Sequence, residues 1–101
     1  MSREVPLTPP GEILAEEWIA PMGLSHHALA KAIGVPPRSI HEIVKGPRAI
    51  TADTAVRLAA FFGTDAQSWM NLQAHYDTEL ATKARIGVEV LAEIRRHAVP
   101  V

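Results

Sequence analysis

The strongest constraint on the fold is the run SHHALAKAIGVPPRSIHEIVKG, in which two short helical patterns stand only a few residues apart. Ser25 is a good N-cap for the first pattern, and Gly34 ends it. Pro36 favours extended geometry in the residue before it, whereas Pro37 suits the first position of a second helix that Gly46 ends. The run predicts two helices joined by a turn of about three or four residues, the length typical of a helix-turn-helix.

Apolar residues at helical spacing predict three more helices. The first is TPPGEILAEEWIAPMG, with Thr8 as its N-cap and Ile13, Leu14 and Trp18 on its apolar side. A fourth helix, ADTAVRLAAFF, follows the N-cap Thr51. A long fifth helix, AQSWMNLQAHYDTELATKA, follows the N-cap Asp65. The predicted fold class is therefore all-α, with five helices.

The tail RIGVEVLAEIRRHAVPV fits two structures. Ile86, Val88 and Val90 alternate as in a strand, whereas Val90, Leu91 and Ile94 suit a short helix. We favour the helix, which would be the sixth. The predicted organisation is an N-terminal arm at 1–8, a helix-turn-helix DNA-binding domain at 9–84 and a C-terminal tail at 85–101.

Length and composition narrow the class of protein. A chain of 101 residues with 48% hydrophobic residues is expected to form one packed domain. No apolar run approaches the roughly 20 residues that cross a bilayer, and the first ten residues do not resemble a signal sequence. The absence of cysteine fits a reducing compartment. We therefore expect a cytoplasmic protein without a membrane partner.

The charges are separated along the chain. The net charge is -1, but residues 25–50 hold four basic residues and one acidic residue, a local charge of +3. The same segment holds three of the five histidines and no aspartate. Because local charge decides what a surface attracts, the helix-turn-helix segment is a candidate for contact with DNA phosphates.

The second helix of a helix-turn-helix enters the major groove, so residues in its first turns can reach base edges. The candidate base-reading residues are Arg38, His41 and Glu42, with Pro37 for apolar contact and Ser39 for a base or a phosphate. The candidate phosphate contacts are Ser25, His26, Lys45 and Arg48.

The sequence gives little support for a metal site, a catalytic site or a base-stacking surface. HEIVK begins like a zinc-protease motif, but Lys45 stands where the second histidine is required, so we predict no metal site and no cofactor. There is no cysteine, serine elbow or phosphate-binding loop, and an enzyme is not expected. The aromatic residues stand at core spacing, which favours burial over base stacking. The acidic side of the first helix is expected to be solvated, with a basic protein partner as the alternative.

The stretch from Pro10 to Asp77 resembles the HigA-type antitoxins, a branch of the phage-repressor-like helix-turn-helix regulators of the XRE type. The motifs PGEIL, IHEIVKG, ITADTAVRLAAFFGT and WMNLQ carry the resemblance. His26 and Lys45 stand where members commonly carry glutamine and asparagine, so the resemblance does not imply an operator sequence.

The resemblance implies a five-helix phage-repressor-like core that binds double-stranded operator DNA as a homodimer and represses its own operon. It also implies a HigB-like toxin partner, a messenger-RNA endonuclease that the antitoxin neutralises. The family's DNA-facing helix corresponds to residues 37–45, and its phosphate-bracing serine to Ser25. Two alternatives remain: an orphan regulator without a toxin, and a protein-interaction module whose DNA face is vestigial.

Overall fold

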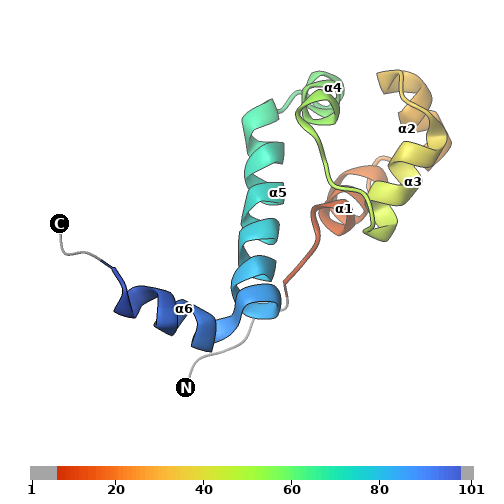
Figure 1. Ribbon diagram of the computed structural model, residues 1–101. Helices are drawn as coiled ribbons and strands as arrows, with labels where there is room; N and C mark the ends of the chain where they lie inside the picture. Colours follow the sequence, from red (N-terminus) through yellow and green to blue (C-terminus); the bar gives the residue numbers. More distant parts are fainter. Residues whose placement is uncertain (1–6, 99–101) are drawn as a thin grey trace.

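The computed structural model describes residues 7–98, and every regular element in that range is helical (Figure 1). The elements are α1 (Pro10–Ile13), η1 (Leu14–Ile19), α2 (His26–Ile33), α3 (Pro37–Lys45), α4 (Ala52–Phe62), α5 (Ala66–Leu80), η2 (Ala81–Ile86) and α6 (Gly87–Arg96), where η marks a π-helical segment. The predicted all-α class is confirmed. The predicted arm at 1–8 lies outside the described residues except for its last two, as do residues 99–101 of the tail.

The first helix differs from the prediction in two ways. Its N-cap is Pro9 rather than Thr8, and the α-helical part ends after Ile13, where π-helical η1 begins. In a π-helix, hydrogen bonds join residues five apart and so bring them to the same side. Leu14 and Ile19 are five apart and only 0% and 4% exposed, so η1 buries both. A regular α-helix would separate them around the axis.

The core lies among α1 to α5. Its largest fully buried side chains are Leu14, Leu29, Ile40, Ile43, Ile50 and Leu58. Trp18, Phe62 and Trp69 form an aromatic cluster beside them, with centroid distances of 5.0 Å for Trp18 to Phe62 and 5.8 Å for Trp18 to Trp69. Trp69 is buried as predicted, Trp18 and Phe62 are half-buried, and Phe61 is 38% exposed.

The other predicted caps are present. The side chains of Ser25, Thr51 and Asp65 each accept a hydrogen bond from the backbone N–H three residues later, as N-caps do. Gly34 and Gly46 end α2 and α3 in the left-handed conformation, with φ of 78° and 110°. These local signals therefore fix both ends of α2 and the end of α3.

Gly11 allows α1 to cross α3 at close range. A Cβ atom at this position would overlap the backbone carbonyl oxygen of Ile43. The glycine of the PGEIL motif is therefore required by backbone packing, and it fixes the end of α3 against α1.

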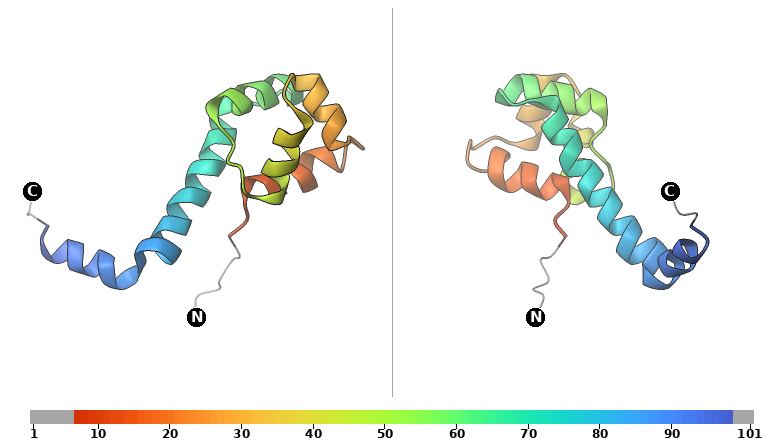
Figure 2. Two further views of the ribbon diagram at one scale, coloured as in Figure 1. Left: turned by 45° about the vertical axis from the view of Figure 1, so that its right-hand side comes forward. Right: turned by 90° about the vertical axis from the view of Figure 1, so that its left-hand side faces the viewer.

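The tail forms a helix, as favoured, and it extends away from the bundle. α5 continues through η2 into α6, which lies far from α1 to α4 in all views (Figures 1 and 2). The molecule measures 51 × 31 × 22 Å. α6 buries none of its residues, and Val88, Val90 and Ile94 are 80%, 50% and 57% exposed. No helix in the described range has both the length and the apolar character of a membrane span.

Candidate nucleic-acid interface

α2 and α3 meet through a three-residue turn, Gly34 to Pro36. The left-handed Gly34 lets the N–H groups of Gly34 and Val35 both donate to the Ala30 carbonyl oxygen, at 2.9 and 3.0 Å. Pro37 then occupies the first position of α3. The predicted helix-turn-helix is present, with a turn of the predicted length.

Arg57 of α4 forms hydrogen bonds with the backbone of this turn. Its Nη1 donates to the carbonyl oxygens of Ile33 at 2.8 Å and Gly34 at 3.4 Å, while its Nε pairs with Asp53 at 3.1 Å. The guanidinium thus satisfies carbonyls at the end of α2 that the helix itself leaves unpaired. The sequence does not predict this role of Arg57, since nothing in the local pattern links it to a turn 23 residues earlier.

α3 presents one face to the core and the other to solvent. Ile40 and Ile43 are 0% and 1% exposed, which anchors the helix. The predicted base-reading residues all lie on the remaining surface: Pro37, Arg38 and His41 are exposed, and Ser39 and Glu42 are half-buried. Lys45 is exposed at the far end of the helix. The structure therefore places this set where a partner could reach it.

Glu42 joins two of the predicted DNA contacts. Its Oε2 accepts from Nε of Arg38 at 3.0 Å, and its Oε1 accepts from Nε of Arg48 at 2.9 Å. The side chain of Arg38 is 84% exposed, that of Arg48 51% and that of Glu42 27%. The hydrogen bond from Arg38 is the main cause that lowers the pKa of the Glu42 carboxyl, and Arg48 adds to it. Glu42 is therefore ionised at neutral pH.

The start of α2 lies against the middle of α3. Ser25 Oγ accepts from the backbone N–H of Ala28 at 2.9 Å, and the rings of His26 and His41 lie 5.9 Å apart at 51°. A phosphate near His26 would therefore also lie near His41. The positive end of the α2 dipole is at the same place and favours an anion there.

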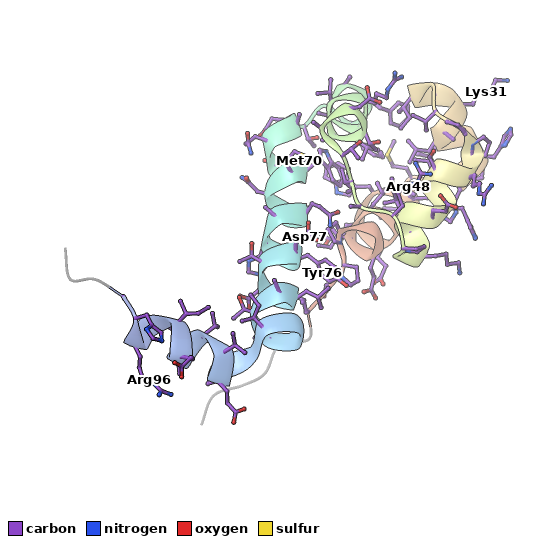
Figure 3. The ribbon with its side chains drawn as sticks, viewed as in Figure 1. Lys31, Arg48, Met70, Tyr76, Asp77 and Arg96 are labelled. Carbon is purple, nitrogen blue, oxygen red and sulfur yellow. The ribbon has the colours of Figure 1, made fainter. Side chains whose placement is uncertain are left out.

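The surface formed by α2 and α3 lies at one end of the molecule, and the helix α6 lies at the other. Figure 3 shows Lys31 on the outer side of α2 and Arg96 on α6, with the body of the bundle and α5 between them. A contact made by α6 would therefore leave the surface of α2 and α3 accessible.

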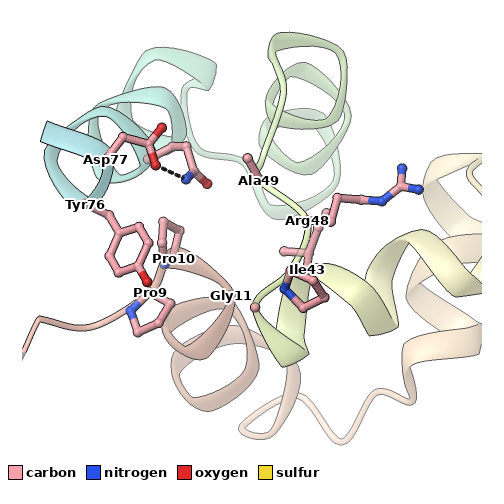
Figure 4. Close-up of a pocket in the computed structure, with 11 residues that line it drawn as sticks. Pro9, Pro10, Gly11, Ile43, Arg48, Ala49, Tyr76 and Asp77 are labelled. Carbon is pink, nitrogen blue, oxygen red and sulfur yellow. Dashed lines mark hydrogen bonds between the residues drawn. The ribbon is translucent and has the colours of Figure 1, made fainter. Parts of the chain in front are cut away.

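The surface of the helical bundle has several small hollows. One lies where the loop after α3 meets α1 and α5, and its walls include Gly11, Ile43, Arg48, Tyr76 and Asp77 (Figure 4). Its volume is about 130 Å³, which is below the roughly 300–1,000 Å³ of common small-molecule sites. Two other hollows, of about 340 Å³ each, lie between α2 and α4 and beside α1 and η1. Within the described residues, no three histidine, aspartate or glutamate side chains are grouped to hold a metal ion. The candidate site is the exposed surface of α3, which presents the predicted base-reading residues and is anchored by its buried apolar side.

Comparisons with known proteins identify the same helix-turn-helix. The family model HTH_3, described as helix-turn-helix, matches residues 16–69. Virulence-associated protein I of Dichelobacter nodosus is 50% identical to the chain over 95 residues, which cover 94% of this chain and 88% of that protein.

Two solved structures share both the fold and the sequence pattern. The Pseudomonas aeruginosa antitoxin HigA, solved with the higBA promoter, gives a TM-score of 0.81 at 36% identity, covering 95% of this chain and 99% of that one. An addiction module antidote protein of a HigA family from Coxiella burnetii gives 0.79 at 40% identity, covering 96% and 100%.

The family match spans more than half of the chain, and its matched segment contains the whole helix-turn-helix described above. The HigA structures extend the likeness over nearly the full length, including the C-terminal helices. Proteins of this family are DNA-binding regulators and not enzymes. The chain therefore belongs to the helix-turn-helix family of DNA-binding transcription regulators, in its branch of HigA-type antitoxins.

Proposed function

We propose that this protein is the antitoxin of a type II toxin-antitoxin module and the repressor of its own operon. It acts in the cytoplasm, binds a palindromic operator as a dimer and neutralises a HigB-like toxin that cleaves messenger RNA. The observation that carries the DNA-binding part is the exposed face of α3, which a buried apolar side and a fixed turn hold in place. The HigA structure with its promoter supports the same role.

Residues 9–84 form the DNA-binding unit in this proposal, with α3 in the major groove. The residues that read bases are Arg38 and His41, with Pro37 and Ser39 beside them and Glu42 on the same face. A guanidinium can donate two hydrogen bonds to guanine, which distinguishes that base by about 1–3 kcal/mol. The phosphate contacts are Ser25, His26, Lys45 and Arg48, around the base-reading face.

Residues 85–101 form the dimerisation tail in this proposal. One module makes few phosphate contacts, whereas two modules about 34 Å apart would read two half-sites of a palindrome. The exposed apolar side chains Val88, Val90 and Ile94 supply a surface that a second copy could cover. Because α6 lies far from α3, pairing there would leave both DNA faces free (Figure 2).

DNA binding can be tested by fluorescence anisotropy with DNA from upstream of the gene and with a scrambled control, over a salt series. We expect tight, salt-sensitive binding that prefers the upstream DNA. Arg38→Ala should reduce the preference, whereas Lys45→Ala should weaken binding to both DNAs and lower the salt slope by about 0.9 for a lost phosphate contact. Equal binding of both DNAs by the unaltered protein would refute the repressor role.

The antitoxin role needs its own test. A small reading frame beside this gene should encode a protein that co-purifies with the chain, arrests growth when expressed alone and is harmless when the two are expressed together. If no neighbouring product binds the chain while the upstream DNA does, the protein is an orphan regulator.

A further inference from the structure

The carboxylate of Glu42 lies between two arginines from different parts of the interface. Arg38 is in the first turn of α3, and Arg48 is in the loop after that helix. Glu42 accepts from the Nε of each, at 3.0 Å and 2.9 Å. One acidic side chain thus links the proposed base-reading arginine to a proposed phosphate-binding arginine.

The geometry leaves useful donors on both arginines. A guanidinium has five N–H donors, and a bond through Nε leaves the four on its terminal nitrogens. Those terminal nitrogens can donate in parallel to the O6 and N7 atoms of guanine. Glu42 therefore restricts the orientation of Arg38 without occupying the end that would meet a base.

The backbone of Glu42 holds the same loop. Its carbonyl oxygen accepts from the N–H groups of Gly46 at 3.0 Å and Arg48 at 3.3 Å. The loop is thus tied to Glu42 by main chain and side chain together. Since Arg48 cannot move far from this residue, the three side chains form one unit with a net charge of +1.

We propose that Glu42 is a positioning residue for specificity: it orients Arg38 for a guanine and couples it to Arg48, and it makes no base contact of its own. This role rests on the proposed DNA-binding function. The carboxylate repels the phosphates of every DNA sequence, and only the correct operator offsets that cost, because only there do the oriented donors of Arg38 find their acceptors. The residue therefore lowers affinity in general and raises discrimination.

Glu42→Gln is the informative change. Glutamine has nearly the same shape but only one acceptor oxygen, so it can hold one arginine and presents an N–H donor to the other. The variant should bind scrambled DNA more tightly, and its operator preference should fall by about 3- to 10-fold, a part of the roughly 5- to 150-fold that a lost arginine–guanine contact would cost. Glu79→Gln is a matched control, since it removes a carboxylate from another pair of i,i+4 type, with Lys83, at the end of α5 and away from the helix-turn-helix.

The decisive experiment is a double-mutant cycle of Glu42→Gln and Arg38→Ala, read as the ratio of operator to scrambled affinity in anisotropy titrations. If Glu42 acts through Arg38, Glu42→Gln lowers the ratio in the unaltered background and leaves it unchanged in the Arg38→Ala background. An equal fall in both backgrounds would mean that Glu42 contacts a base itself, and this would overturn the proposal. A uniform gain in affinity with no change in ratio would reduce Glu42 to a repulsive charge and would also overturn it.

Failure of the proposed function is distinguishable. If the unaltered protein shows no operator preference, the repressor function fails and the specificity role of Glu42 fails with it. If the preference is present and the cycle shows no coupling, only the inference about Glu42 is refuted.

Discussion

The side-chain oxygen of Gln73 accepts a hydrogen bond of 2.8 Å from the backbone N–H of Ile50, 23 residues earlier in the chain. Its amide nitrogen donates in turn to Asp77 at 2.9 Å (Figure 4). Gln73 is 7% exposed and Ile50 is 2% exposed, so the bond between them is shielded from water. This contact attaches the segment that follows α3, and that carries Arg48, to the long helix α5.

Gln73→Met should therefore destabilise the fold by about 1–3 kcal/mol, because it leaves the Ile50 N–H buried without an acceptor. Urea denaturation followed by circular dichroism measures the change. Gln67→Met is the control: the side chain of Gln67 is exposed and donates to Asn71 of the same helix, so its replacement should change the free energy of unfolding by less than about 0.5 kcal/mol. Equal effects of the two changes would show that the long-range bond contributes nothing.

Gly11→Ala should be more damaging than an ordinary glycine-to-alanine change. The new methyl group would overlap the carbonyl oxygen of Ile43, so α1 and α3 must separate, at a cost of about 3 kcal/mol or more. Thermal and urea unfolding should both reveal the loss. Glu12→Ala, at the exposed neighbouring position, should be nearly neutral. A fully stable Gly11→Ala variant would disprove the close approach of these two helices.

Ile94→Asp should produce a folded monomer. Ile94 is 57% exposed on α6, and a carboxylate there would be buried without a partner if a second copy covered this helix. Light scattering coupled to size-exclusion chromatography measures the mass of the protein in solution. The monomeric variant should also bind the operator more weakly. Val56→Asp is the matched control because Val56 is 58% exposed on α4. Dissociation caused by Val56→Asp and not by Ile94→Asp would place the dimer surface on α4.

Asp65 should make the fold sensitive to acid. The Ser68 backbone N–H, and then its hydroxyl, lower the pKa of the Asp65 carboxyl from its ordinary value of 3.8. Since the folded protein then binds fewer protons than the unfolded chain, the stabilisation is complete above that ordinary value and is lost as the pH falls through the folded pKa.

Asp65→Asn isolates this contribution. Asparagine is also a good N-cap but does not titrate, so the variant should lose less stability than the unaltered protein on acidification. Urea midpoints at neutral pH and at roughly pH 3 measure the difference. Parallel losses in the two proteins would show that Asp65 does not contribute to the acid sensitivity.

Local signals in the sequence predicted most of the fold. The N-caps at Ser25, Thr51 and Asp65 and the glycine at the end of α2 are correct because each acts on the backbone within a few residues. The prediction of Thr8 as an N-cap is wrong, since proline rather than a side-chain acceptor begins α1. The sequence pattern does not indicate η1, because the turn that buries Ile19 beside Leu14 is chosen by packing.

The sequence by itself determined an all-helical chain, the short turn between two capped helices, the basic segment and the residues of α3 that face outward. Only the tertiary structure decided that Arg57 supports the turn, that Glu42 links Arg38 to Arg48, that Gln73 holds Ile50, and that α6 extends away with its apolar side uncovered. The physical reason is how far apart along the chain the interacting residues lie. A cap or a turn depends on the chemistry of adjacent residues, whereas these contacts depend on where packing places groups that are far apart along the chain.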